Sequence, residues 1–156
     1  MKVLIDIDGV MVPAHSWKMP EIHADGFPLF SSQAVKALTR ILQETNADLV
    51  LTSSHKSKYT PFQWREIFVS RGVPAVQVQT LPPNDAGITR KEELLNWLSS
   101  AGVEDFIIID DDKSLNDLPS ALKQRLILIN GLIGLTDPQA EEAIALLRSN
   151  INRLSA

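Results

Sequence analysis

Hydrophobic residues along the chain gather in five short runs that are apolar at nearly every position. Runs of this kind are typical of strands that are buried on both faces of a parallel sheet. They predict strands at Val3–Ile7, Asp48–Thr52, Ala75–Gln79, Phe106–Ile109 and Leu126–Ile129.

The segments between these runs repeat their apolar residues at helical spacing. Between residues 32 and 45, for example, Ala34, Leu38 and Ile41 fall on one face of a helix. The same spacing, with proline or glycine near the ends, predicts helices at Ser32–Thr45, Pro61–Ser70, Arg90–Ala101 and Asp137–Arg153. Strands that alternate with helices predict an α/β fold, a three-layer Rossmann-like domain with a central, mainly parallel sheet.

Composition and charge narrow the class of protein. With 156 residues, 44% of them hydrophobic and 22% charged, the chain suits a single globular domain, residues 1–156. No apolar run is long enough to span a membrane, and acidic residues interrupt the N-terminal stretch where a signal peptide would be apolar. The absence of cysteine excludes disulfides and cysteine nucleophiles, and is compatible with the cytoplasm, where we expect the protein. A net charge of −4 gives no electrostatic basis for tight binding to duplex nucleic acid.

Polar residues that could take part in catalysis or bind a ligand follow the predicted strands. Asp6 and Asp8 end the first strand on one side, and the repulsion between them calls for a bound cation or a shared catalytic task. Because the carboxyl ends of parallel strands lie along one edge of a sheet, further polar side chains are expected nearby. These are Thr52 and Ser53 after the second strand, Asp110 and Asp111 after the fourth, and Arg90 and Lys91 at the start of a helix. Such a set of carboxylates suits Mg²⁺, and hydroxyls beside a cation suit a phosphate.

The order of these motifs resembles a known superfamily. The segments DIDGV, LVLTSS, RK and IIIDDD, between Val3 and about Leu118, are similar to the four motifs of the haloacid dehalogenase (HAD) superfamily. The short lengths between the motifs resemble small capless members, which implies a HAD-like domain with no large cap domain. The segments LTSSHK and IIIDDD are also similar, more weakly, to HAD domains of nucleic-acid repair proteins.

The resemblance implies a role for each acidic residue. Asp6 would be the nucleophile that forms an aspartyl-phosphate, and Asp8 the general acid and then the base that activates water. Mg²⁺ would be held by the Asp6 carboxylate, the Asp8 backbone carbonyl and Asp111, with Asp110 as a further or water-mediated ligand. The implied function is a Mg²⁺-dependent phosphomonoester hydrolase.

The resemblance also implies how the phosphate is held. Thr52 would donate a hydrogen bond to a phosphoryl oxygen, together with the Ser53 backbone amide. The cation at the helix start is either Lys91 or Arg90, and Lys91 is the expected one because the superfamily usually has lysine. The substrate would be a phosphorylated small molecule, a nucleotide or a nucleic-acid end.

Two loops are predicted to border this edge. Residues 11–30 show no regular period and are expected to form a flap over the site, with His15, Trp17 and His23 among its side chains. Its aromatic residues either contact the leaving group or fill the top of the core. Its histidines are not spaced as a metal-ligand set. Leu81–Ile88 would form another wall.

Two other classes of protein share part of this pattern. A receiver-like regulatory module also gathers aspartates and a lysine at a sheet edge, but its phosphoacceptor lies on the middle strand, whereas Thr52 ends the second strand here. A metal-dependent nuclease would need another carboxylate, typically a glutamate, at a separate strand end, and the sequence offers none. The alternative kept open is the receiver-like module with a Mg²⁺ site.

Overall fold

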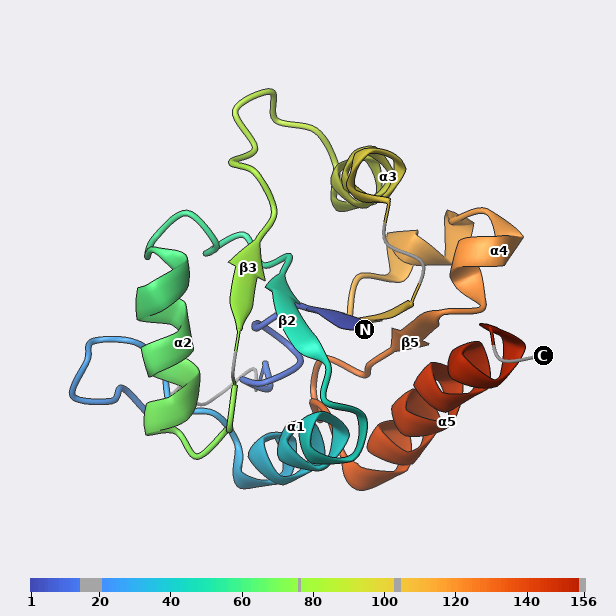
Figure 1. Ribbon diagram of the computed structural model, residues 1–156. Coiled ribbons are helices and arrows are strands. Elements are labelled where there is room, and N and C mark those ends of the chain that lie inside the picture. Colours follow the sequence, from blue (N-terminus) through green and yellow to red (C-terminus); the bar gives the residue numbers. More distant parts are fainter. Residues whose placement is uncertain (15–20, 76, 103–104, 155–156) are drawn as a thin grey trace.

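Five parallel strands form the centre of the molecule in the order β3-β2-β1-β4-β5 (Figure 1). The computed structural model describes residues 1–14, 21–75, 77–102 and 105–154. The strands are β1 (Lys2–Ile5), β2 (Asp48–Leu51), β3 (Val78–Thr80), β4 (Phe106–Asp110) and β5 (Leu126–Leu128). The predicted parallel α/β fold is therefore confirmed, although β3 begins later than predicted because the Ala75 backbone amide donates to Val73 in a turn.

The first three helices each begin after a residue whose side chain caps them. The helices are α1 (Ser32–Thr45), α2 (Pro61–Ser70), α3 (Arg90–Ala101), the short α4 (Ser120–Lys123) and α5 (Asp137–Leu154), with a 3₁₀ helix, η1, at Lys113–Asp117. Thr60 and Thr89 each accept a hydrogen bond at the start of α2 and α3 and complete a capping box with Gln63 and Glu92. The sequence did not predict η1 or α4, which lack an apolar repeat of helical length.

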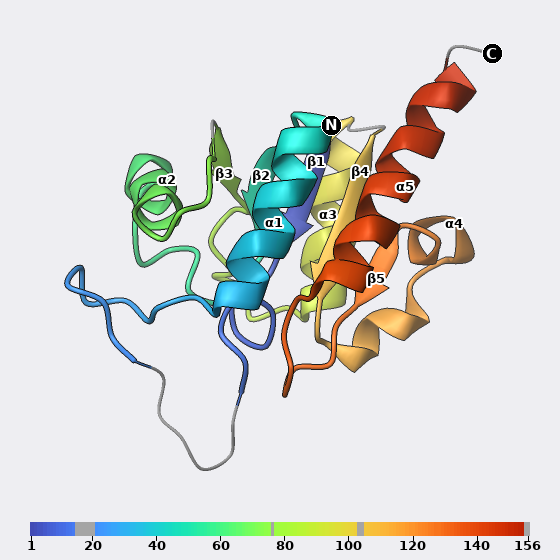
Figure 2. The same ribbon diagram turned by 90° about the horizontal axis from the view of Figure 1, so that it is seen from below.

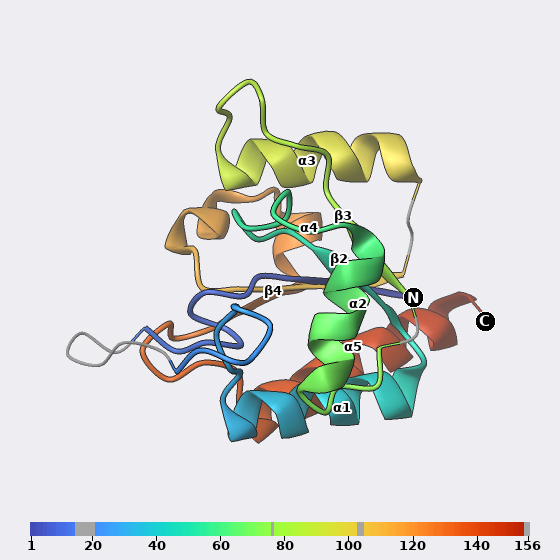
Figure 3. The same ribbon diagram turned by 90° about the vertical axis from the view of Figure 1, so that its left-hand side faces the viewer.

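Strand residues alternate between two apolar cores. Val3 and Ile5 of β1 belong to the larger core, which also contains buried residues of α1, α2 and α5. Leu4 of β1 belongs to the smaller core, which includes Leu94 of α3 and Leu115 of η1. Figure 3 shows the resulting layers, with α3 and α4 on one side of the sheet and α1 and α5 on the other. Within the described residues no separate cap domain is present, as predicted.

The chain reverses direction across the sheet at β1. From β1 it runs outward to β2 and β3, and then returns to β4 on the other side of β1. In such sheets, ligands bind outside the carboxyl ends of the strands at this reversal point. The loops that follow β1 and β5 lie together at this end of the sheet (Figure 2). In the described part of the chain, no helix combines the length and the apolar composition that crossing a membrane requires.

Residues 21–30 of the predicted flap are held against the end of α2. The Arg71 guanidinium, which is 1% exposed, donates to both carboxylate oxygens of Asp25 at 2.7 and 2.9 Å and to the backbone oxygens of Phe27 and Pro28. This contact lowers the pKa of Asp25 to about 2. The Phe27 ring is buried and packs edge-on against His55 and other rings, so it fills the top of the core. The predictions for His15 and Trp17 lie outside the described residues.

Candidate functional site

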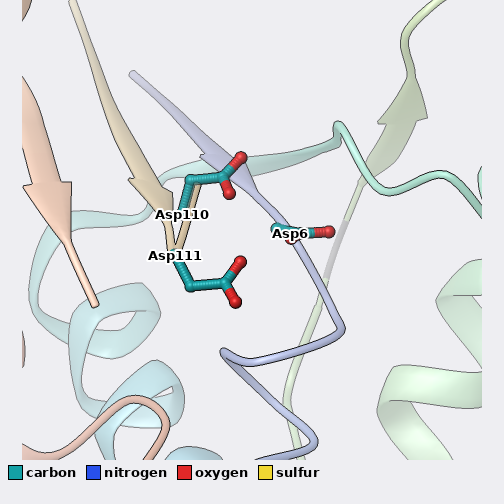
Figure 4. A group of neighbouring side chains, drawn as sticks. All are labelled: Asp6, Asp110 and Asp111. Carbon is teal, nitrogen blue, oxygen red and sulfur yellow. The ribbon is translucent and has the colours of Figure 1, made fainter. Parts of the chain in front are cut away.

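Three aspartates meet at the carboxyl ends of β1 and β4. One carboxylate oxygen from each of Asp6, Asp110 and Asp111 lies within 4.8 Å of the others (Figure 4). The strand register explains this grouping, because Ile5 pairs with Ile109 and the following residues leave the two neighbouring strands side by side. Asp6 and Asp110 are buried, whereas Asp111 is half-buried.

Two glycines make room for the third of these carboxylates. A Cβ atom at Gly9 would lie 2.0 Å from Oδ2 of Asp111, and one at Gly131 would lie 2.6 Å from the same oxygen. Gly9 also has φ +80°, a backbone conformation that residues with side chains rarely adopt. The turn after β1 and the loop after β5 therefore hold Asp111 between two backbones that approach closely.

The three carboxylates of the cluster carry more negative charge than the neighbouring Arg90 guanidinium can balance. The pKa of Asp6 is raised to about 8, chiefly by burial and then by the neighbouring carboxylate of Asp110, while Arg90 and the Ile7 amide oppose the rise. Burial likewise raises the pKa of Asp110, against the effect of Arg90. A divalent cation would relieve this repulsion, and a set of three carboxylates is the donor chemistry that Mg²⁺ prefers. The residues present therefore fit the cofactor that the sequence predicts.

The pKa of Asp6 predicts how the metal-free protein responds to pH. With a folded-state pKa of about 8 and an ordinary value of 3.8, Asp6 holds a proton in the folded state that the unfolded chain has released. Stability should therefore fall as the pH rises from about 4 to about 8. Asp6→Asn removes this penalty, so at pH 8 in a chelator the variant should unfold at least about 3 °C above the wild type, equivalent to about 1 kcal/mol.

Thermal unfolding in a chelator at pH 5 and pH 8 measures this effect. Added Mg²⁺ should raise the melting temperature of the wild type at pH 8 and have less effect on Asp6→Asn. Asp117→Asn, at an exposed position on η1, is the matched control and should unfold like the wild type at both pH values. An Asp6→Asn protein that is less stable than the wild type at pH 8 without metal would contradict the electrostatic account.

Arg90, rather than Lys91, brings a cation to this cluster. Nη1 of Arg90 lies 2.6 Å from Oδ2 of Asp110 and 3.5 Å from Oδ2 of Asp6. Burial lowers the pKa of Arg90, but the carboxylates of Asp110 and Asp6 outweigh it and raise the pKa overall. Among the described residues Lys91 forms no ion pair with these carboxylates. The Thr89 cap sets this difference, because it fixes Arg90 as the first residue of α3.

The turn after β2 presents an unpaired hydroxyl beside the cluster. Oγ1 of Thr52 is fully buried and has no hydrogen-bond partner within the described part of the chain. The Ser53 side chain accepts a hydrogen bond from the His55 amide, and the Ser53 amide donates to no described acceptor. An orphaned buried hydroxyl costs free energy unless a ligand satisfies it. Thr52 and Ser53 therefore form the side of the site that can receive an anion.

Asp8 stands apart from the acidic cluster. The strand ends before Asp8, so its carboxylate does not share the position of Asp6; it is exposed, and its Oδ2 lies 2.8 Å from Nε2 of His55. The side chain of Asp8 therefore lies at the exposed rim of the site against His55, while the predicted metal contact through its backbone carbonyl stays a prediction. His23 contacts Asp25 at 3.6 Å and contributes nothing to the cluster.

Sequence reasoning missed several residues of this edge. Lys56 is 4% exposed, and its Nζ lies 2.6 Å from Oε2 of Glu93 on α3. The sequence analysis noted the LTSSHK segment that contains Lys56, but a lysine after a strand usually has a solvated side chain. The pairing with Glu93 arises only from the fold, which brings α3 next to the turn after β2. His55 and Gly131 were likewise unassigned, because their partners Asp8 and Asp111 are distant in the sequence.

No curated protein matches this chain. A solved structure from Legionella pneumophila, assigned to subfamily III A of the HAD superfamily hydrolases, is 14% identical, with a TM-score of 0.40 over 97% of this chain and 89% of its own. The family model described as the HAD domain in Swiss Army Knife RNA repair proteins matches residues 2–140. That match spans both strand ends of the acidic cluster and the turn after β2, so the chain belongs to this family of HAD domains.

Proposed function

We propose that the protein is a Mg²⁺-dependent phosphomonoester hydrolase that acts through an aspartyl-phosphate on Asp6. The observation that carries this proposal is the position of the orphaned Thr52 hydroxyl at the same sheet edge as the cluster of Asp6, Asp110 and Asp111. A site for a cation alone would need only the carboxylates. A buried donor without a partner supports the binding of an anion there as well.

The proposed metal ligands are the three clustered carboxylates. Asp6, Asp110 and Asp111 would hold Mg²⁺, with the backbone carbonyl of Asp8 as a further ligand. When bound, Mg²⁺ supplies positive charge that lowers the repulsion between a carboxylate nucleophile and a phosphate. Arg90 and Thr52 bring a cation and a hydroxyl donor to the same edge and would bind phosphoryl oxygens.

The protein's own residues account for the transfer steps. A carboxylate oxygen of Asp6 attacks phosphorus, the bond to the leaving oxygen breaks, and Asp8 gives that oxygen a proton. Asp8 then takes a proton from water, which attacks the phosphoryl group and frees Asp6. The exposed position of Asp8 at the rim suits this exchange with a leaving group and with solvent, and His55 holds its carboxylate in place.

The family supports a proposal for the substrate class. Its members are the HAD domains of RNA repair proteins, which supports a phosphate on a nucleic-acid end or a nucleotide as the substrate. The absence of a cap domain in the described residues is compatible with a substrate larger than a metabolite. The net charge of −4 favours recognition of a terminus over tight binding along a duplex.

Turnover of 4-nitrophenyl phosphate with and without Mg²⁺ tests the activity. Repeated turnover that requires Mg²⁺ is expected, and 3′- and 5′-phosphorylated oligonucleotides compared with phosphorylated metabolites would then identify the leaving group. A receiver-like module would instead take up one phosphoryl group from a small donor and stop. Phosphorylation of that kind without repeated turnover would overturn the assignment as a hydrolase.

Thr52→Val separates phosphate binding from folding. The substitution removes a hydroxyl that has no partner, so the free energy of unfolding should change by less than about 1 kcal/mol, while inhibition by inorganic phosphate weakens about tenfold or more. Competition with phosphate and thermal unfolding measure the two effects. Thr45→Val is the matched control, because the buried Thr45 hydroxyl donates to Ile41 at 2.6 Å and its loss should lower stability by about 1 kcal/mol. Unchanged inhibition in Thr52→Val would remove Thr52 from the phosphate site.

A further inference from the structure

A two-part recess lies between α3 and the loop of residues 81–88. Its inner part, of about 420 Å³, is mostly polar and is lined by Ser54, Lys56 and Arg90 among others. Its outer part, of about 200 Å³, is mostly apolar, and Trp97 of α3 lines it. The two parts share residues 83–85 and Glu93, so they adjoin one another along the loop.

The inner part adjoins the sheet edge that carries the acidic cluster. Arg90 lines it and also contacts Asp110 and Asp6 through Nη1. Ser54 lines it too, two residues after the orphaned hydroxyl of Thr52. A molecule whose phosphate lies against Thr52 and Arg90 can therefore extend into the recess without leaving the protein surface.

The charges that line the inner part are balanced, with two cations, Lys56 and Arg90, and two carboxylates, Asp85 and Glu93. Lys56 is paired with Glu93 at 2.6 Å, and Arg90 is paired with Asp110 outside the lining. Neither cation of this lining is left over for a second phosphate, whereas its hydrogen-bonding groups suit a neutral group that carries hydroxyls.

The outer part offers apolar walls in a fixed arrangement. Asn84 binds the backbone of Ile88 twice, accepting from its amide at 2.9 Å and donating to its carbonyl at 2.7 Å, which closes the loop on itself. Pro82 and Pro83 add stiff apolar surface next to the Trp97 ring. A flat ring is the shape that stacks best on such an aromatic wall.

We propose that this recess binds the nucleoside next to the scissile phosphate, with its sugar in the inner part and its base against Trp97. The order of the lining carries the inference: phosphate site, then balanced polar groups, then apolar walls with an aromatic ring. The proposal deepens the phosphatase function proposed above and rests on it. It identifies the leaving group as a terminal nucleoside.

Kinetic discrimination tests the proposal. The measured quantity is kcat/KM for a nucleoside monophosphate, tested as the 3′ and the 5′ isomer, divided by kcat/KM for glycerol 2-phosphate. In the wild type this ratio should be well above one, and Trp97→Ala should lower it about tenfold, the usual effect of losing one stacked base. Because Trp97 also packs against the smaller core, Asn96→Arg provides a second variant that fills the outer part from an exposed position.

A matched control and a binding measurement complete the test. Ser99→Arg adds the same side chain to an exposed position of α3 that does not line the recess, and it should keep the wild-type ratio. Adenosine, which has no phosphate, should shift the Trp97 indole signal in the NMR spectrum of Asp6→Asn, and Asn96→Arg in the same background should abolish the shift. Equal ratios in all variants, or no shift of the indole signal, would overturn the proposal.

These readouts separate failure of the recess from failure of the phosphatase assignment. If the protein hydrolyses phosphomonoesters but does not distinguish nucleotides, the recess proposal is wrong and the proposed function stands. If no phosphomonoester is hydrolysed, the proposed function is wrong, and the adenosine titration still decides whether the recess binds a nucleoside.

Discussion

Asp6→Asn is expected to lower kcat for 4-nitrophenyl phosphate by at least about 10³-fold, since loss of a covalent nucleophile typically costs this much or more. An amide cannot attack phosphorus as a carboxylate does, and it is a weaker ligand for a hard cation. Asp6 is buried at the end of β1, beside Asp110 and Asp111, and no other described carboxylate occupies the position from which Asp6 would attack. Steady-state turnover at saturating Mg²⁺ measures the loss.

The control for this variant must also remove one negative charge, but at a position outside the site. Asp117→Asn removes one carboxylate from an exposed position on η1 and should retain wild-type turnover. Mass spectrometry after rapid quenching should detect a phosphoryl group on Asp6 in the wild type and none in Asp6→Asn. Robust turnover by Asp6→Asn would exclude the covalent route.

Arg90→Ala is expected to lower kcat/KM by about 10²-fold or more, in the range observed when one donor to a transition-state anion is removed. Arg90 is the cation that contacts both Asp6 and Asp110, so its loss removes charge from the phosphate site and leaves a buried carboxylate unpaired. Lys91→Ala should change kcat/KM less than about threefold, well below the tenfold that one lost interaction of 1.4 kcal/mol would give. Parallel kinetics of the two single variants decide which residue supplies the cation.

Stability must be separated from catalysis in this pair. Thermal unfolding with Mg²⁺ should show Arg90→Ala to be less stable than Lys91→Ala, because only Arg90 is buried against carboxylates. Arg90→Lys keeps the charge but loses the planar guanidinium, and it should recover part of the activity. A large loss in Lys91→Ala, with Arg90→Ala near the wild type, would restore the assignment that the sequence favoured.

Much of the fold followed from local patterns. The alternation of apolar runs with helical repeats predicted the parallel sheet, and α2 and α3 begin at the predicted residues, Pro61 and Arg90. The extent of β3 did not follow, because a turn at Val73 uses backbone groups that the sequence assigned to the strand. The small elements η1 and α4 were missed since tertiary contacts, not periodicity, hold them.

The residues of the candidate site that directly follow a strand could be predicted from the sequence. The sequence predicted that Asp6, Asp110 and Asp111 lie along one edge of the sheet, and the structure shows that their strands are direct neighbours. Choosing between Arg90 and Lys91 required the position of α3 relative to β1 and β4, because only the fold brings Arg90 against Asp110 and Asp6. The Lys56–Glu93 pair joins two elements across the sheet edge, so no local pattern could reveal it.

The two glycines around Asp111 provide a separate criterion for recognising relatives of this chain that keep a working site. Motif searches detect the acidic residues, whereas glycine at positions 9 and 131 leaves the space that the Asp111 carboxylate occupies. In a relative with every aspartate but alanine at position 131, the Asp111 carboxylate would have to turn away from its present position, unless the loop after β5 moved outward. We therefore expect glycine at both positions to accompany activity across such sequences, although only one of the two lies in a recognised motif.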